Sequence, residues 1–379
     1  MRIAIARETL PGEARVALVP EALGALISAG YEVALQPGAG HGAMMTDEAY
    51  QHAGAVVDEA AMAQADLVVS VQPLPPDALQ EIPRGAATIS FFPANQRLRE
   101  VLLRRDHGVT TFAMEYVPRI SRAQSMDALS SQSLVAGYRG AIVAAGRLRQ
   151  FFPLNMTAAG TLPPAQVVVL GAGVAGLQAI ATCRRLGAVV KGYDVRAAAA
   201  EEIRSMGAIA IDLELPTLEG AGGYAREMTE DRAALQQERL APYIAAADAL
   251  ITTAAVPGRR APVLVTRAMV EQMKMGSVVV DLAAESGGNV EGVVPGKVVQ
   301  MGQAQLWGGS NVPSQMPAPA SRLYAHNVSA VIKLMTADQQ FAPDFTDEIV
   351  SAMCVTHAGE VVHQQTRTLL TETGGTIGE

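Results

Sequence analysis

The chain has 379 residues, with 29 basic and 37 acidic side chains and a net charge of −8. This acidic balance argues against nucleic acid as a partner, because binding to a phosphate backbone needs a basic surface. Hydrophobic residues make up 49% of the chain, which excludes a disordered protein. The length predicts two or three domains, since single hydrophobic cores stop growing beyond ~250–300 residues.

Residues 1–120 alternate strand and helix patterns, the order that builds parallel βαβ units. Strands are expected at residues 2–6, 31–36, 66–71, 88–92 and 109–113, and helices at residues 20–29 and 47–53. A polar segment, residues 118–133, follows and is dense in hydrogen-bonding groups. From about residue 131 a long helix is expected to run to residue 151 and to lead into a second domain.

A second βαβ series follows, and a helix over residues 321–335 then leads back toward the first domain. The strands of this series are expected at residues 166–170, 189–193, 249–253, 277–282 and 303–307. The predicted fold class is α/β, with two Rossmann-like, doubly wound parallel-sheet domains separated by a cleft. The first domain would comprise residues 1–130 and be completed by residues 320–379, and the second would comprise residues 131–319.

The 33 residues from Phe151 to Cys183 carry no charge and by length alone could span a bilayer. Proline and glycine residues divide this run into a loop, a short strand and the beginning of a helix, so no direct membrane insertion is expected. No metal site is expected either. The two cysteines, Cys183 and Cys354, allow no thiolate site or disulfide framework, and the six histidines lack metal-ligand spacing.

Residues 171–176 (GAGVAG) match the GxGxxG pattern of dinucleotide-binding turns, between an apolar strand and a predicted helix. The first glycine allows a tight bend, the second lets the backbone approach a pyrophosphate, and the third allows close helix–strand packing. Free N–H groups at the helix N-terminus then face the phosphates. The residues expected to contact the cofactor here are Gly171, Gly173, Val174, Ala175 and Gly176. A glycine-rich turn without a ligand is the alternative.

Asp194 lies 23 positions after Gly171, at the end of the next predicted strand. A carboxylate there accepts hydrogen bonds from the adenosine ribose and repels a 2′-phosphate, so NAD(H) is favoured over NADP(H). Arg196 weakens this preference, because an arginine at this place accommodates a phosphate. Asp194, Val195 and Arg196 are accordingly expected to contact the cofactor.

Several stretches resemble a known family. Residues 13–20 (EARVALVP) and the glycine turn resemble the alanine dehydrogenase/pyridine nucleotide transhydrogenase family. Residues 119–127 (RISRAQSMD), followed by residues 130–133 (SSQS), resemble the NAD(H)-binding domain I, or alpha subunit, of proton-translocating NAD(P) transhydrogenases. Residues 221–228 (AGGYAREM) are similar to the mobile loop of that domain. The resemblance covers the chain nearly from end to end.

The same family contains alanine dehydrogenases, which need a cation for the keto acid and a proton donor at its carbonyl. In these enzymes a lysine and a histidine follow the strands that match residues 66–71 and 88–92. This sequence has Gln72 and Pro93 at those two positions, and Arg15 alone is not a catalyst. Direct hydride transfer between two nicotinamides requires close positioning and exclusion of water, but no acid or base. The resemblance therefore implies a transhydrogenase.

The resemblance also assigns residues to the nicotinamide and its ribose, namely Arg119, Gln124, Asp127 and Ser130. Ser130 would hold the carboxamide, Arg119 and Asp127 would form a charge pair, and Gln124 would reach the second nucleotide. The alternative is a polar hinge between the domains.

Two further segments are expected at the cofactor. Gly223 and Tyr224 are expected to form a lid over the nucleotide, with an exposed loop tip as the alternative. Ala255, Val256 and Pro257 follow a strand at the carboxyl edge of the sheet, where the nicotinamide ribose is expected.

The implied activity is that of a Re/Si-specific, proton-translocating NAD(P) transhydrogenase. This chain would bind NAD(H) and exchange hydride with NADP(H) on a partner subunit, coupled to a membrane proton-channel subunit. The resemblance further implies a homodimer and a cytoplasmic location, peripheral at the inner membrane through the partner subunits. Two alternatives are an alanine dehydrogenase-like NAD-dependent oxidoreductase and a non-catalytic NAD-sensing subunit.

Overall fold

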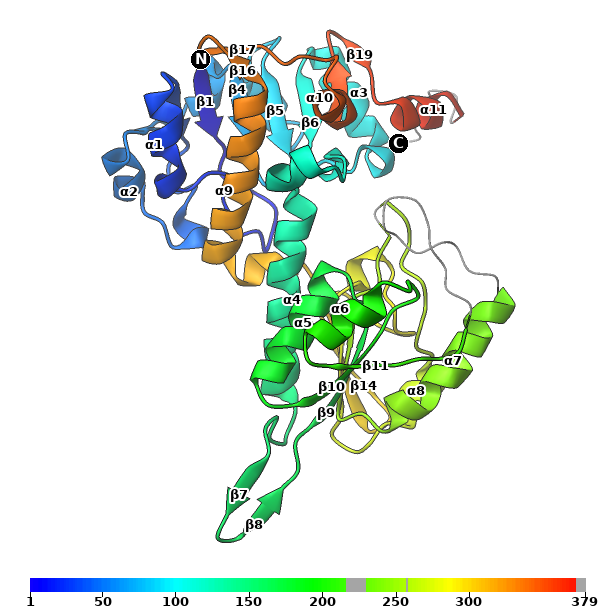
Figure 1. Ribbon diagram of the computed structural model, residues 1–379. Coiled ribbons are helices and arrows are strands. Elements are labelled where there is room, and N and C mark those ends of the chain that lie inside the picture. Colours follow the sequence, from blue (N-terminus) through cyan, green and yellow to red (C-terminus); the bar gives the residue numbers. More distant parts are fainter. Residues whose placement is uncertain (216–229, 257, 373–379) are drawn as a thin grey trace. The chain divides into compact units, whose positions relative to one another are not determined.

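The computed structural model describes residues 1–215, 230–256 and 258–372. Contacts divide the chain into two compact units, of which one comprises Met1–Gln132 and the chain from Ser314 onward, and the other Ser133–Pro313. Each unit is built on a mainly parallel sheet with helices packed on its faces (Figure 1). The predicted fold class, α/β with two Rossmann-like domains, is therefore confirmed.

The first unit contains an eight-stranded sheet in the order β19-β18-β6-β5-β4-β1-β2-β3, parallel from β3 to β6. Its strands are β1 (Arg2–Ile5), β2 (Glu32–Leu35), β3 (Val56–Val57), β4 (Leu67–Val69), β5 (Ala87–Ser90), β6 (Thr110–Ala113), β18 (Cys354–His357) and β19 (Glu360–Val361). Its helices are α1 (Pro20–Ser28), α2 (Asp47–His52), α3 (Leu98–His107), α9 (Pro317–Leu334), α10 (Glu348–Met353) and α11 (Gln364–Glu372). A small hairpin, β16 (Thr336–Ala337) and β17 (Gln340–Phe341), follows α9.

Consecutive residues of β1 point into two different cores, as the two-residue period of a strand requires. Ile3 and Ile5 pack with residues of α1 and α9, whereas Ala4 packs in the core on the opposite face. Tyr324 and Val328 of α9 are fully buried in the same core as Ile3. The C-terminal part of the chain thus returns to the first sheet, and β18 extends that sheet antiparallel to β6.

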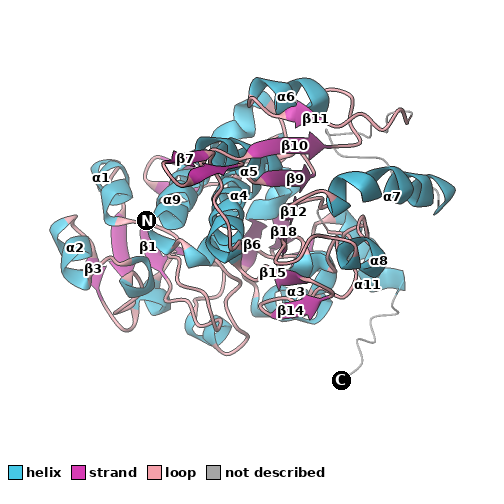
Figure 2. Ribbon diagram, turned by 90° about the horizontal axis from the view of Figure 1, so that it is seen from below, coloured by secondary structure: helices cyan, strands magenta, loops and turns pink. Residues whose placement is uncertain are grey.

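The second unit contains a seven-stranded sheet in the order β11-β10-β9-β12-β13-β15-β14, parallel except for β14. Its strands are β9 (Gln166–Leu170), β10 (Val189–Tyr193), β11 (Ile209–Ala210), β12 (Ala249–Thr252), β13 (Val278–Asp281), β14 (Val298–Met301) and β15 (Ala304–Gly308). Its helices are α5 (Val174–Arg185), α6 (Ala199–Ser205), α7 (Glu230–Ala245) and α8 (Arg267–Glu271). Residues of α5 and α6 pack on one face and residues of α7 and α8 on the other (Figure 2).

Helix α4 (Ala128–Arg147) carries the chain from the first unit into the second. The sequence predicts its start near residue 131, but the helix begins earlier because Asp127 accepts a hydrogen bond from Ser130 N at 2.9 Å. A carboxylate that receives an early N–H of a helix stabilises its first turn. The later residues of α4 pack against the second sheet, with Ala141 and Ala144 fully buried.

Residues 151–165, for which the sequence predicts a loop, instead contain a hairpin of β7 (Asn155–Thr157) and β8 (Gly160–Leu162). The hairpin extends away from the sheet of its own unit (Figure 1), and Met156 is 75% exposed. The prediction was wrong because proline and glycine hid the strand pattern. In the described parts of the chain, no helix combines the length and apolar character that crossing a membrane needs.

Candidate dinucleotide-binding site

The glycine fingerprint forms a tight turn between β9 and α5, at the carboxyl edge of the second sheet. Gly171 has a left-handed φ of +96°, and a Cβ atom there would lie 2.6 Å from the Thr253 hydroxyl oxygen. A Cβ atom on Gly176 would lie 1.8 Å from the carbonyl oxygen of Gly171. Both positions require glycine, because a side chain would force the turn and the helix apart.

Gly173, the middle glycine of the turn, has open space in front of its backbone. A Cβ atom there would meet no atom within 4 Å. Gly173 is also the N-cap of α5 and supplies no capping side chain, while Val174 and Ala175 begin the helix. N–H groups at such a helix end carry partial positive charge and bind phosphate groups. The turn therefore fits a pyrophosphate.

Asp194 follows β10 and lies beside this turn, where its Oδ2 accepts a hydrogen bond from Ala172 N at 2.8 Å. Arg196 Nε donates to Asp194 Oδ1 at 2.9 Å, and Arg196 Nη2 donates to the Ala172 carbonyl at 3.1 Å. The hydrogen bonds with Asp194 raise the pKa of Arg196. Val195, between the two, packs against the core of its sheet. A ribose hydroxyl that binds Asp194 must share its carboxylate with this guanidinium.

Asn289, which no sequence motif singles out, holds the loop after β12. Its Nδ2 donates to the carbonyls of Ala254 and Pro262, both at 2.8 Å, and its Oδ1 accepts from Ala254 N at 2.9 Å. The Asp281 carboxylate in turn receives Asn289 N at 2.7 Å. These buried bonds fix the start of the loop that carries Ala255 and Val256. The sequence offers no local signal for Asn289, because its partners lie 27 and 35 positions away.

The polar segment of the first unit contains a 3₁₀ helix, Ser121–Met126, followed by Asp127 and α4. Asp127 accepts hydrogen bonds from Ser130, at 2.9 Å from its N–H and 2.6 Å from its hydroxyl. Two of the four residues predicted at the nicotinamide are thus in contact. Arg119 and Gln124, the other two, are exposed. The predicted Arg119–Asp127 charge pair stays a prediction.

This segment is anchored to α9 by Asn327, a second amide that no sequence motif singles out. Asn327 Nδ2 donates to the Ser125 carbonyl at 2.8 Å, and its Oδ1 accepts from the Ser131 hydroxyl at 2.7 Å. The amide therefore joins the 3₁₀ helix to the first turn of α4. A segment fixed in this way is more ordered than a simple hinge.

The carboxyl edge of the first sheet holds a buried ion pair. Arg15, which is 4% exposed, pairs with the fully buried side chain of Glu13 at 2.6 Å and donates to Gln132 at 2.8 Å. The amide of Gln72 donates to the same Glu13 carboxylate at 2.8 Å. Burial alone would raise the pKa of Glu13, but the hydrogen bonds and charge of Arg15 lower it to about 2. Gln72 and Arg15 are thus both engaged by Glu13.

Two more buried carboxyl groups close the loops after β4 and β5. Glu8 accepts hydrogen bonds from Val71 N at 2.6 Å and from Gln72 N at 3.2 Å. Glu115 accepts from Phe92 N at 2.9 and 2.8 Å, next to Pro93. Burial raises the pKa of Glu8 to about 8 and that of Glu115 to about 7. Side chains of the protein itself therefore fill this edge.

Comparison with known proteins identifies the family. Residues 4–136 match the alanine dehydrogenase/PNT N-terminal domain, and residues 140–364 match the alanine dehydrogenase/PNT C-terminal domain. The chain belongs to this family. It is 46% identical to an NAD(P) transhydrogenase alpha subunit from Rhodospirillum rubrum, a match that covers 96% of this chain and 98% of the relative.

Members of both branches of the alanine dehydrogenase/PNT family are similar to the chain. The transhydrogenase structure from Sinorhizobium meliloti has a TM-score of 0.87 and 43% identity, covering 96% of this chain and 100% of that one. Alanine dehydrogenase from Bacillus subtilis is 32% identical, over 77% of this chain and 73% of that enzyme. Sequence identity is therefore higher to the transhydrogenases.

Three residues predicted at the cofactor, Gly223, Tyr224 and Pro257, lie outside the described residues. Ala255 is exposed and Val256 half-buried on the loop that Asn289 fixes. For this member of the family, the geometry thus describes a dinucleotide turn in one unit and a self-paired polar edge in the other.

Proposed function

We propose that the chain is the NAD(H)-binding subunit of a proton-translocating NAD(P) transhydrogenase. In this role it exchanges hydride directly between its own NAD(H) and NADP(H) held by a partner subunit. The observation that carries the proposal is the contrast between the open Gly173 turn and the Glu13–Arg15–Gln72 cluster. The first fits a dinucleotide, and the second leaves the keto-acid chemistry of a dehydrogenase without its groups.

A dehydrogenase acting on a keto acid needs a cation for the carboxylate and a proton donor at the carbonyl. Gln72 carries no charge, and Pro93 has no proton to give. The guanidinium of Arg15 is already paired with Glu13 at 2.6 Å. An incoming carboxylate would have to compete with that buried carboxylate, which favours the transhydrogenase over the dehydrogenase alternative.

Bound NAD(H) supplies the hydride at its nicotinamide ring, and the residues of the chain orient that ring. Gly171, Gly173 and Gly176 would let the backbone approach the pyrophosphate, and Asp194 would bind the ribose. Asp127 holds the Ser130 hydroxyl at 2.6 Å, which would present Ser130 to the carboxamide in one orientation. The exposed amide of Gln124 would contact the second nucleotide.

The proposal includes two partner subunits, one that binds NADP(H) and one that conducts protons through the membrane. It also includes a homodimer, with the chain located on the cytoplasmic side of the inner membrane through those partners. The exposed apolar residues of the β7–β8 hairpin support an interface between copies, since Met156 is 75% and Leu162 49% exposed. Two-fold dimers are the commonest oligomers.

The test uses the purified chain with NADH and an oxidised NAD analogue, with and without a partner domain loaded with NADP(H). The proposal predicts that NADH binds in both cases and that hydride transfer occurs only with the partner. Binding without transfer in either case would favour an NAD-sensing subunit. Oxidation of NADH by pyruvate and ammonia without the partner would favour an alanine dehydrogenase.

A substitution at Gln124 tests its assigned role. Gln124→Asn should lower the rate of hydride transfer far more than NADH affinity, because a shorter amide no longer reaches the second nucleotide. An equal loss in both quantities would mean that Gln124 only binds NADH.

A further inference from the structure

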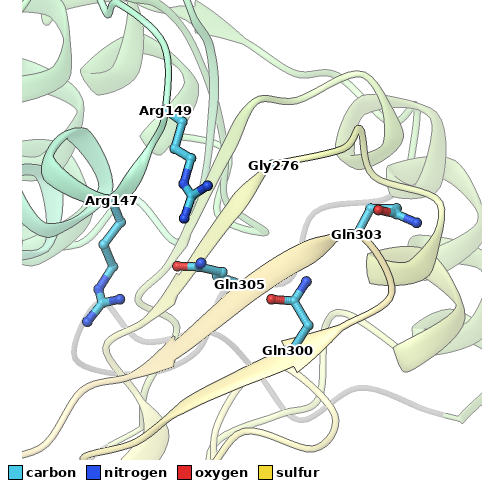
Figure 3. A pocket seen from close by; sticks show the side chains of 6 residues that line it. All are labelled: Arg147, Arg149, Gly276, Gln300, Gln303 and Gln305. Carbon is cyan, nitrogen blue, oxygen red and sulfur yellow. The ribbon is translucent and has the colours of Figure 1, made fainter.

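A small cavity of about 230 Å³ lies at the end of α4 in the second unit, where it meets the β14–β15 hairpin. The residues that line it are Arg147, Arg149, Gly276, Gln300, Gln303 and Gln305 (Figure 3). The proposed transhydrogenase role makes no use of this cavity.

The two sheet residues of the cavity share one face of the hairpin. Gln300 and Gln305 are register partners in the antiparallel pair of β14 and β15, so their side chains lie on the same side. Trp307, two residues after Gln305, packs in the same core as Ala144 and Leu148 of α4. Helix α4 therefore covers this face, and its end brings the arginines to the two glutamines.

The cavity is positively charged. Arg147 and Arg149 form no hydrogen bond or ion pair with any other residue in the described part of the chain. None of the six lining residues is acidic, so the two guanidinium groups are not neutralised within the lining. The C-terminus of α4 contributes only about half a negative charge, which two arginines outweigh.

The arrangement of the polar groups suits an oxyanion. In Figure 3 the Arg149 guanidinium points toward the Gln305 amide, while Gln303 extends toward the other side of the hairpin. Gln300 Nε2 donates to the Gly302 carbonyl at 3.1 Å, which holds the turn of the hairpin. A guanidinium presents parallel N–H donors that match the oxygens of phosphate groups.

We propose that this cavity binds a phosphate group, with Arg147 and Arg149 as its principal ligands and Gln305 as an additional donor. The volume corresponds to about eight water molecules at ~30 Å³ each, which suits one phosphate group. It is below the ~300–1,000 Å³ of pockets that enclose larger ligands. A dinucleotide therefore does not fit.

The cavity is distinct from the dinucleotide turn. Gly276 precedes β13 and Gln305 lies near the beginning of β15, whereas Gly171 follows the end of β9. These strands are parallel, so the cavity lies at the amino edge of the sheet and the turn at the carboxyl edge. A phosphate in this cavity cannot be the pyrophosphate of NAD, and the inference does not depend on the proposed function.

The test measures binding of inorganic phosphate to the full chain by phosphorus NMR, and thermal unfolding in phosphate against chloride at equal ionic strength. The double variant Arg147→Gln/Arg149→Gln should weaken phosphate binding at least about tenfold, because charge-assisted hydrogen bonds are lost. Arg185→Gln is the matched control. Arg185 is an exposed arginine in the last turn of α5, so this variant removes the same kind of charge from a similar helix end.

Saturable phosphate binding that the double variant loses and the control retains is the expected result. A second arm uses vesicles with and without phosphatidylglycerol, and sedimentation of the wild type alone would identify a lipid headgroup as the source of the phosphate. Phosphate stabilises many proteins without a site. Equal stabilisation of all variants, or no binding in either arm, would overturn the proposal.

Discussion

The two sheets share one topology but treat their carboxyl edges in opposite ways. In the second unit the edge is open, because Gly173 has no atom within 4 Å of a would-be Cβ and no side chain caps α5. In the first unit the same edge is filled by Glu8, Glu13 and Arg15, which bond to one another or to adjacent loops. The comparison shows that the side chains at the edge, rather than the fold, decide which sheet receives a ligand.

The largest expected effect comes from breaking the closed edge. Glu13→Ala leaves the Arg15 guanidinium buried beside Gln132 without its carboxylate. Removal of one partner of a buried ion pair costs about 3–5 kcal/mol of unfolding free energy. Chemical denaturation measures this loss. Glu21→Ala, in the exposed pair with Arg322, is the control and should cost about 0–1 kcal/mol. Equal losses would mean that the edge is not tightly closed.

The pH dependence of stability tests the same edge through Glu8. Its pKa is about 8 in the folded protein against an ordinary value of 4.5, so the folded state holds a proton that the unfolded state releases. The stabilisation is complete below pH ~4.5 and is lost as the pH rises toward ~8. Glu8→Gln should remove this loss, which is on the order of 3 kcal/mol by pH 7.

Urea unfolding at several pH values provides the measurement for Glu8, and Glu360→Gln, at an exposed glutamate, is the control. Glu115, with a pKa of about 7, contributes a dependence of the same sign. The informative quantity is therefore the difference between variant and wild type. A difference that does not change with pH would show that Glu8 ionises freely at this edge.

At the open edge, Gly176→Ala should reduce NADH affinity about a hundredfold, or by ~2.7 kcal/mol. The reason is the 1.8 Å separation that a Cβ atom would have from the Gly171 carbonyl oxygen, which must displace the turn. Fluorescence titration with NADH measures the change. An affinity within a factor of about two of the wild type would show that the turn does not contact the cofactor.

A smaller effect is expected from Gly137→Ala in α4. A Cβ atom there would lie 2.1 Å from the Ala175 carbonyl oxygen, at the beginning of α5, and such overpacking typically costs ~1–3 kcal/mol. Both NADH affinity and stability should fall. Gly146→Ala is the matched control in the same helix, because a Cβ atom there meets nothing within 4 Å. It should stabilise the chain by about 0.5–1 kcal/mol and leave NADH affinity unchanged.

Local sequence signals predict most of the central sheets and the glycine turn. The strands at residues 166–170 and 189–193 are observed with those bounds, because apolar runs next to glycine are strong signals. The antiparallel additions, β14 and β18–β19, were missed because their pairing depends on the sheet they join. Asn289 was missed for a similar reason, since a buried amide with distant partners leaves no local pattern.

The closed edge could be predicted only in part. The sequence identifies Gln72 and Pro93 as residues without the charge or the proton of a dehydrogenase. It does not indicate that Glu13 would bind both Arg15 and Gln72, because the Gln72 contact joins positions 59 residues apart. The identity of a residue is thus visible in the sequence, whereas its occupancy by a neighbour requires the fold.

The most direct test of the central claim follows one hydrogen atom. The chain is mixed with NADH deuterated at C4 on the transferable side, an NADP⁺-loaded partner domain and, separately, pyruvate with ammonia. The account predicts that deuterium appears at C4 of NADPH without exchange into water, and that no deuterated alanine forms. Deuterated alanine in the absence of the partner, or loss of the label to water during transfer, would contradict it.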